Sequence, residues 1–210
     1  MPLRPSASLA ASDPRRLRAA RVADASSVSG VLVVAATQRE LELLDGVETL
    51  CCGIGPVEAA LATARGIAER APRAILHVGI AGARTLEPPA LVLGTQSVYG
   101  DVIDAASVLP RVERAEPDAA LLEAVHRALT AAHLLPIATS ARVGGGTACD
   151  VEAMEGFGVL RAAALAGVPA VELRAVSNAV GEPDRARWRI DDALAALRDA
   201  VSRLNEEIDV

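Results

Sequence analysis

Three polar residues, far apart in the chain, stand next to segments that the sequence predicts as buried strands. Glu40 follows the apolar run 31–36. Asn178 ends the apolar run 169–177, and Glu155 precedes it. Open α/β sheets bind ligands at the carboxyl ends of their strands, so we expect these side chains to meet at one such edge. There a carboxylate can activate water or accept hydrogen bonds from hydroxyl groups, and a carboxamide can donate to a ring nitrogen. Taken alone, Glu40 is also explained as an acidic residue in the first turn of a helix, where the helix dipole favours it.

The segment around Glu155 is predicted to be helical. We expect a helix that is capped by Asp150, carries Glu155 and ends at Gly167, followed directly by a buried strand. Gly156 and Gly158 come just after the glutamate. Each glycine inside a helix costs about 1 kcal/mol relative to alanine. We therefore expect another group to approach this helix closely.

The rest of the chain alternates strand-length apolar runs with amphipathic helices, which is the pattern of an α/β domain. Further strands are predicted at residues 31–36, 47–52, 74–78, 91–100 and 137–143. Helices are predicted to end at residue 44 and to span 56–70, 117–132 and 191–207. The helix at 56–70 is expected to pack through an apolar face that includes Val57 and Leu61. The helix at 191–207 is expected to pack on the sheet through the face formed by Leu194, Leu197, Val201 and Leu204. We expect a single catalytic domain over residues 31–208.

Composition limits the classes of partner. The chain has 210 residues, is 51% apolar and carries a formal net charge of −6. Its aromatic residues are Tyr99, Phe157 and Trp188, so a flat ligand must stack on one of these or on aliphatic side chains. An acidic chain with so few rings lacks the basic surface and the stacking platforms of nucleic-acid-binding proteins. It has no apolar run of membrane-spanning length. We expect no nucleic acid or membrane partner, and a cytoplasmic protein whose three cysteines are reduced core thiols.

Several segments resemble functional motifs without completing them. Residues 1–30 are basic and rich in small polar side chains but lack an apolar core, so we expect a disordered tail and not a secretory signal. The glycine turn at 53–55 is typical of a dinucleotide-binding site, but the next strand does not end in the acidic residue that such a site needs. The glycine-rich turn at 144–147 is not followed by the lysine of a P-loop. The cysteines and histidines have no metal-ligand spacing. We expect no metal and no organic cofactor.

The run MEG…VPAVELRAVSN resembles the purine nucleosidase and phosphorylase superfamily, in which ME(A/G)…VPF…VRAISD is typical. MEGF at 154–157, Asn178 in place of aspartate, and EPDRARWRI at 182–190 are similar to the futalosine hydrolases. The resemblance covers roughly residues 31–204, in patches. It implies a three-layer α/β/α sandwich around a central mixed, mostly parallel sheet, and it implies a homodimer.

The same resemblance implies roles for individual residues. Glu40 falls on the catalytic base, Glu155 on the carboxylate that holds the ribose hydroxyls, and Asn178 on the residue that contacts the purine. Arg174 is expected to orient the carboxylates, although a plain ion pair with Glu172 also explains it. The implied substrate-binding residues are Ile54, Ile80, Ala81, Gly82, Met154, Arg174, Val180, Arg185 and Trp188.

Asn178 bears on the choice of purine. Adenine-specific relatives carry aspartate here, whereas the amide of asparagine donates to N7 and O6, both acceptors in hypoxanthine. The leading hypothesis is therefore hydrolysis of the N-glycosidic bond of a 6-oxopurine nucleoside, futalosine, to hypoxanthine and dehypoxanthine futalosine in menaquinone biosynthesis. One of Arg185, Arg187 and Arg189 is expected to receive the carboxylate of the futalosine tail.

Three alternatives stay open. One is a methylthioadenosine/adenosylhomocysteine nucleosidase, and another is a purine nucleoside phosphorylase, for which Arg39 and Arg84 could bind phosphate. The third is a non-catalytic nucleoside-binding protein. Relatives cover the purine with a phenylalanine that the short segment 144–155 lacks, so Trp188 or Tyr99 is expected to take its place.

Overall fold

The computed structural model describes residues 30–42, 44–101, 111–144 and 146–208. The predicted tail at residues 1–30 therefore lies outside the described residues, except for its last glycine. Eight strands belong to one sheet. They are β1 (Val31–Ala35), β2 (Glu48–Cys51), β3 (Ala74–Ala83), β4 (Leu91–Tyr99), β5 (Arg114–Ala115), β6 (His133–Thr139), β7 (Val151–Ala153) and β8 (Ala170–Ala179). The helices are α2 (Gln38–Leu41), α3 (Pro56–Arg70), α4 (Ala119–Ala128), α5 (Gly156–Ala166) and α6 (Ile190–Ile208), with a 3₁₀ turn η1 (Arg185–Arg187).

The sheet is mixed and mostly parallel. Its strand order is β2-β1-β3-β7-β6-β4-β5, and β8 pairs with both β3 and β4. The antiparallel pairs are β3 with β7, β4 with β5, and β4 with β8, and the other pairs are parallel. Strands β3, β8, β4, β6 and β7 pair in a closed circuit, so this part of the sheet curls back on itself.

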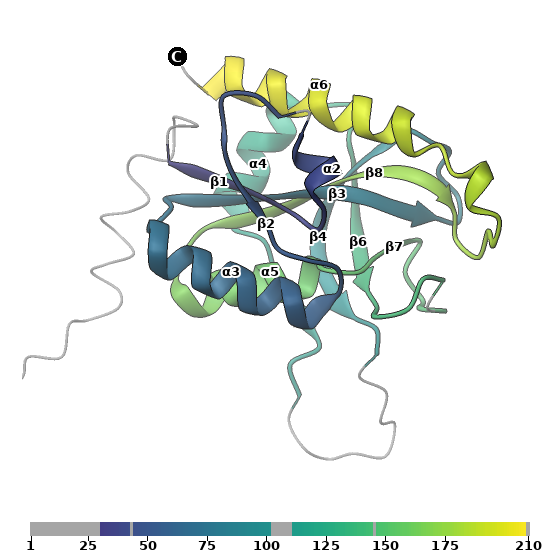
Figure 1. Cartoon of the computed structure of the whole chain (residues 1–210), viewed down its shortest axis with the longest axis horizontal. Helices are drawn as coiled ribbons and strands as arrows, with labels where there is room; N and C mark the ends of the chain where they lie inside the picture. The colour runs from purple at the N-terminus through teal and green to yellow at the C-terminus, as the bar shows by residue number, and fades with distance from the viewer. Residues whose placement is uncertain (1–29, 43, 102–110, 145, 209–210) are drawn as a thin grey trace, which may run out of the picture.

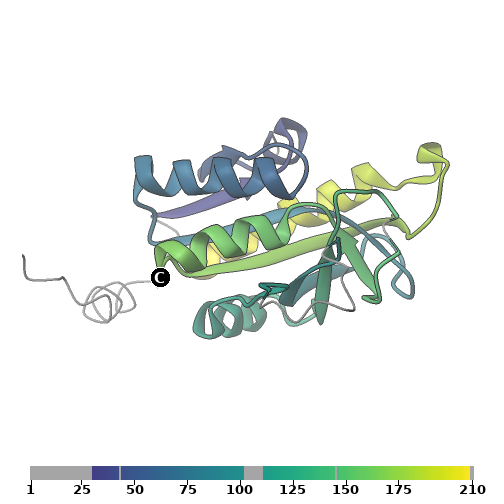
Figure 2. The same cartoon turned by 90° about the horizontal axis from the view of Figure 1, so that it is seen from below.

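Helices cover both faces of the sheet (Figures 1 and 2). On one face α4 and α6 pack on a core that includes Leu76, Val78, Leu173, Leu194 and Val201. On the other face α3 and α5 pack on a core that includes Leu32, Val34, Ile75, Val159 and Leu160. Full burial of each such side chain stabilises the fold by about 1.5–3 kcal/mol. The predicted three-layer α/β/α sandwich is confirmed.

The bounds of α3 agree with the prediction, but its buried face does not. Proline at the first helical position and a left-handed residue after Arg70 delimit the helix. Its inward residues are Ala59, Thr63 and Gly66, whereas Val57 and Leu61 are 64% and 65% exposed. Small side chains are needed inside because α5 approaches closely: a Cβ on Gly158 of α5 would collide with the carbonyl oxygen of Pro56. Val57 and Leu61, two residues of the face predicted to be buried, are therefore on the surface of the single chain.

The predicted helix around Glu155 is wrong in its first half. Residues Val151–Ala153 form strand β7, and α5 begins only at Gly156. Asp150 caps no helix; it accepts a hydrogen bond from the Thr85 hydroxyl at 2.8 Å. Glu155 thus sits at the junction between strand and helix. The expected close approach is present, because the Glu172 carboxylate occupies the space that a side chain at Gly156 would need.

Other boundaries shift for similar reasons. Strand β3 runs on to Ala83, five residues beyond the predicted end at residue 78, and residues 79–82 are paired with β8 and in part with β7. Strand β6 covers 133–139, four residues earlier than the predicted start, and α4 ends at Ala128 and not at 132. The core face predicted for the last helix is buried as expected.

Candidate active site

A cavity of about 400 Å³ opens at the carboxyl ends of β1, β3 and β8. The three predicted catalytic residues line it, and so do all of the implied substrate-binding residues except Arg174, although they come from segments far apart in the chain. These lining residues are Glu40, Ile54, Ile80, Ala81, Gly82, Met154, Glu155, Asn178, Val180, Arg185 and Trp188.

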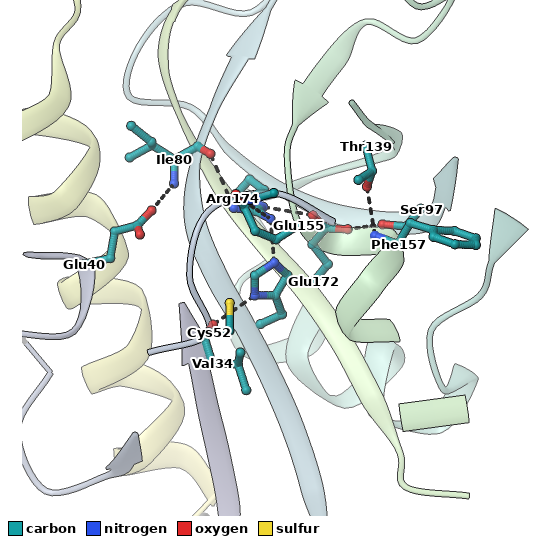
Figure 3. A network of polar contacts seen from close by, with 12 residues as sticks. Val34, Glu40, Cys52, Ile80, Ser97, Thr139, Glu155, Phe157, Glu172 and Arg174 are labelled. Carbon is teal, nitrogen blue, oxygen red and sulfur yellow. Dashed lines mark hydrogen bonds and ion pairs between the residues drawn. The ribbon is translucent and has the colours of Figure 1, made fainter. Parts of the chain in front are cut away.

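Glu40 is held by the start of α2 and by β3. Thr37 caps the helix, and its backbone N–H and its hydroxyl both donate to Oε2 of Glu40, at 2.9 and 2.8 Å. The backbone N–H of Ile80 donates to Oε1 at 3.2 Å (Figure 3). The side chain is 8% exposed and lines the cavity. Each carboxylate oxygen has more than one acceptor site, so a carboxylate fixed in this way can still bind a water.

Glu155 reaches the cavity from the start of α5. Its Oε1 accepts a hydrogen bond from the backbone N–H of Gly55 at 3.1 Å, and its Oε2 pairs with Nη2 of Arg174 at 3.3 Å. Burial raises the pKa of this carboxyl above its usual value, although Arg174 and the Gly55 N–H act in the opposite direction. The charged form of Glu155 therefore depends on these two partners.

Arg174 lies behind the cavity and does not line it. Its guanidinium is 1% exposed, and its Nε pairs with Oε1 of Glu172 at 2.9 Å while Nη2 contacts Glu155. The second oxygen of Glu172 accepts a hydrogen bond from the Ser97 hydroxyl (Figure 3). Both predicted partners are present, but the assignment of Arg174 to substrate binding is not supported by its position. Its contacts with Glu155 and Glu172 suit the expectation that it orients the carboxylates.

His77 completes this buried network and was missed by sequence reasoning. Its Nδ1 lies 2.9 Å from the carbonyl oxygen of Val34, which can only accept, so Nδ1 carries the proton. Nε2, 2.5 Å from Nη2 of Arg174, is then the acceptor. Burial, and next the positive charge of Arg174, hold the pKa of His77 well below its usual value. A single polar residue inside the apolar strand AILHVGIAGA was the signal available in the sequence.

Replacing His77 with glutamine is expected to weaken the pH dependence of stability. In the wild type the folded state keeps this imidazole neutral, whereas the unfolded chain binds a proton below its usual pKa of 6.5. The free energy of unfolding therefore falls by about 1.4 kcal/mol as the pH drops from about 7.5 to about 5.5. Urea denaturation of both proteins at these two pH values measures the difference. An equal loss of stability in the variant would contradict the assignment of His77 as neutral in the folded protein.

Two hydrogen bonds hold the side-chain amide of Asn178 in one orientation. Its Oδ1 accepts from the Ser177 hydroxyl at 2.8 Å, and its Nδ2 donates to the carbonyl oxygen of Ala179 at 2.9 Å. The second hydrogen of Nδ2 is left for a ligand. A Cβ on Gly82 would lie 3.1 Å from this nitrogen and 3.3 Å from Val180, so a glycine keeps the floor of the cavity open.

Of the two aromatic covers that were expected, Trp188 lines the cavity and Tyr99 does not. Tyr99 stacks instead on Phe157, with ring centroids 4.9 Å apart. The guanidinium of Arg185 lies over the Trp188 ring, 5.4 Å from its centroid. Arg185 lines the cavity, whereas Arg187 pairs with Glu182 and Arg189 with Asp192.

The expectation of core thiols fits Cys52 but not Cys51. The three cysteines are free, with Cys52 buried, Cys149 partly buried and Cys51 exposed. Burial, and then the charge of Glu155, raise the pKa of Cys52 to about 12. This cysteine therefore stays a thiol and is a poor nucleophile.

Glu152 is a cavity residue that the sequence analysis did not single out. It lines the cavity from β7 and is 7% exposed. Its Oε1 accepts from Nη2 of Arg84 at 2.7 Å, and from the backbone N–H and hydroxyl of Thr147 at 2.9 and 2.8 Å. An acidic residue between two buried apolar ones was the available signal, but β7 itself was not predicted.

Within the described residues, no group of three or more His, Cys, Asp or Glu side chains could hold a metal ion. None of the described helices is long and apolar enough to cross a membrane.

Sequence comparison assigns the chain to a family. It is 38% identical over 192 residues to the futalosine hydrolase of Streptomyces coelicolor, and the match covers 77% of this chain and 80% of that protein. The chain belongs to the futalosine hydrolase family. Residues 42–149 also match the model of the Phosphorylase superfamily. The resemblance inferred from MEGF and Asn178 is thereby confirmed.

Solved structures agree on the fold. A futalosine hydrolase mutant of Helicobacter pylori superposes with a TM-score of 0.76 at 18% identity, over 84% of this chain and 98% of that one. The 5′-methylthioadenosine/S-adenosylhomocysteine nucleosidase of Neisseria meningitidis, in complex with methylthio-immucillin-A, gives a TM-score of 0.69 at 23% identity, over 85% of this chain and 97% of that one. A futalosine hydrolase and a 5′-methylthioadenosine/S-adenosylhomocysteine nucleosidase thus share this fold, so the fold alone does not decide between the two activities.

Proposed function

We propose that this protein hydrolyses the N-glycosidic bond of futalosine, releasing hypoxanthine and dehypoxanthine futalosine for menaquinone biosynthesis. The observation that carries the proposal is the convergence of Glu40, Glu155 and Asn178 on one nucleoside-sized cavity. Membership of the futalosine hydrolase family supports the choice of substrate.

The three side chains match the charges of the reaction. Breaking a bond between ribose and purine builds positive charge on the sugar and negative charge on the base. The carboxylate of Glu155 holds the ribose hydroxyls and stabilises the cationic sugar. Glu40 orients a water and accepts its proton as that water attacks the anomeric carbon. The free N–H of Asn178 donates to N7 of the departing hypoxanthine, where negative charge accumulates.

Water is favoured over phosphate as the nucleophile. Glu40 is an acidic residue at the position where phosphate would have to bind, and like charges repel. The two arginines that could bind phosphate in a phosphorylase are already paired with carboxylates. Arg39 lines the cavity but pairs with Asp191 at 2.6 Å, and Arg84 pairs with Glu152 at 2.7 Å.

The side of the cavity formed by Arg185 and Trp188 suits the tail of futalosine. The tail ends in a benzoate, which needs a flat apolar contact and a cation. Trp188 offers the ring and Arg185 the guanidinium, and both line the cavity.

The exposed apolar side chains near Ile54 are consistent with the expected homodimer. Ile54 lines the cavity and is 61% exposed, and Val57 and Leu61 on the following helix are exposed as well. The homodimer and the cytoplasmic location are part of this proposal.

The proposed function is tested by incubating the purified protein with futalosine, inosine and methylthioadenosine, each with and without phosphate, and quantifying the free base by chromatography. We expect hypoxanthine from futalosine at a rate that phosphate does not increase. Release that requires phosphate would indicate a phosphorylase, and adenine from methylthioadenosine as the faster reaction would indicate the other nucleosidase.

A further inference from the structure

Glu152 and Asn178 face each other across a glycine. In the register of the sheet, Gly82 of β3 pairs with Asn178 of β8 on one side and with Glu152 of β7 on the other. Residues directly opposite one another on paired strands project from the same face of a sheet. The backbones of the two residues are therefore two strand spacings apart, about 10 Å, and the strand between them contributes no side chain of its own at this position. The amide of Asn178 and the side chain of Val180 lie over this glycine. Glu152, Gly82 and Asn178 all line the cavity.

The Glu152 carboxylate has one oxygen engaged and one oxygen without a partner. Oε1 takes the three hydrogen bonds from Arg84 and Thr147. Oε2 is buried, and no group among the described residues donates to it. The whole side chain is 6% exposed. Buried polar atoms nearly always have a hydrogen-bond partner, and Glu152 lines the cavity, so the unpaired oxygen of this carboxylate points to a ligand that donates a hydrogen bond.

Glu152 is charged at neutral pH. Burial by itself raises the pKa of this carboxyl, but the hydrogen bonds from Arg84 and Thr147 outweigh it and hold the pKa below its usual value. Its partners on Oε1 also fix the orientation of the group. The carboxylate is thus an acceptor and not a donor, and it would repel a ligand atom that carries a lone pair.

We propose that Glu152 accepts the N1–H of a 6-oxopurine, so that Glu152 and Asn178 together select hypoxanthine over adenine. Hypoxanthine presents N7 and O6 as acceptors and N1–H as a donor along one continuous edge. Asn178 donates at the N7 end, and Glu152 accepts at the N1 end. Adenine has a bare lone pair at N1, which would face the carboxylate. This inference rests on the proposed function, because it assigns the purine to the same cavity.

The two oxygens of Glu152 have separate roles. Through Oε1, Glu152 holds Arg84 and Thr147, which is a structural role that any ligand would depend on equally. Through Oε2, it discriminates between bases. A Glu152→Gln variant can keep an oxygen toward Arg84 and Thr147 and put an NH₂ group where Oε2 was. That NH₂ donates to N1 of adenine and clashes with N1–H of hypoxanthine.

The test measures binding of free hypoxanthine and free adenine by calorimetry, which does not require turnover. The wild type is expected to bind hypoxanthine more tightly than adenine. The Glu152→Gln substitution is expected to lower the affinity for hypoxanthine by about 10- to 100-fold, which is the effect of losing a hydrogen bond to a charged group. The variant is expected to bind adenine as well as the wild type does, or better. Asp150→Asn is the matched control, since its side chain does not line the cavity, and it is expected to leave the ratio of the two affinities unchanged. An equal loss for both bases, or an unchanged ratio in Glu152→Gln, would overturn the proposal.

A second measurement needs no variant and so does not depend on how well Glu152→Gln folds. The wild type should bind 1-methylhypoxanthine at least about 10-fold more weakly than hypoxanthine, because the methyl group removes the donor. Equal affinity would overturn the role of Glu152. If base selection is as expected but futalosine is not hydrolysed, the proposed function fails and this inference stands. If futalosine is hydrolysed and the bases are not distinguished through Glu152, the proposed function stands and this inference fails.

Discussion

The Glu40→Gln variant is expected to hydrolyse futalosine about 10²–10⁴-fold more slowly than the wild type, the usual contribution of a general base. Glutamine retains an oxygen that can accept from Thr37, but it cannot take a proton from water. The effect should fall on kcat more than on KM, because Glu40 acts on the water and not on the bound nucleoside. Steady-state kinetics with the release of hypoxanthine as the signal measures both constants.

Glu42→Gln provides the matched control for this prediction. It makes the same chemical change two residues later, on an exposed side chain at the end of α2. Its kinetics should equal those of the wild type, and circular dichroism should show the same fold for both variants. A Glu40→Gln protein that is folded and fully active would remove the general base from the mechanism.

The Glu155→Gln variant is expected to lose about 10²–10⁴-fold in kcat/KM, because two hydrogen bonds from the ribose hydroxyls to a charged acceptor are each worth about 1.5–3 kcal/mol. The wild type should also lose activity as the pH falls through the pKa of Glu155, which burial places above the usual value of 4.5. The variant should lack this acidic limb. A pH–rate profile of kcat/KM for both proteins tests the two expectations together.

A substrate change isolates the contact with the ribose. The 2′-deoxy analogue of futalosine removes one hydroxyl that Glu155 is proposed to hold, so the wild type should process it poorly. The variant should distinguish the two substrates much less, because the interaction is already lost. Equal discrimination by both proteins would mean that Glu155 acts only through the buried network of Arg174 and Glu172.

Local signals in the sequence were sufficient for elements that are delimited by their own residues. Helix α3 begins with Pro56 and ends beside a left-handed residue, and both bounds were predicted. The apolar face of α6 was also predicted, since its large side chains pack on a sheet that covers them. The inward face of α3 was not, because close approach of α5 selects small residues there and leaves Val57 and Leu61 outside.

Elements that depend on distant partners were missed. Strand β7 has three residues and exists because β3 and β6 pair with it, and the last part of β3 is likewise extended by β7 and β8. Without β7, Glu152 had no predicted place next to Gly82. Glu40, Glu155 and Asn178 were found because motifs around them resemble a family, whereas His77 and Glu152 stand outside those motifs.

The most direct test of the account is a crystal structure of the Glu40→Gln variant with intact futalosine bound. We predict that the nucleoside occupies the cavity with its ribose hydroxyls on Glu155, N7 of its base next to Nδ2 of Asn178, and its anomeric carbon facing residue 40. Futalosine bound elsewhere, or in this cavity with its ribose hydroxyls away from Glu155 and its base away from Asn178, would contradict the account.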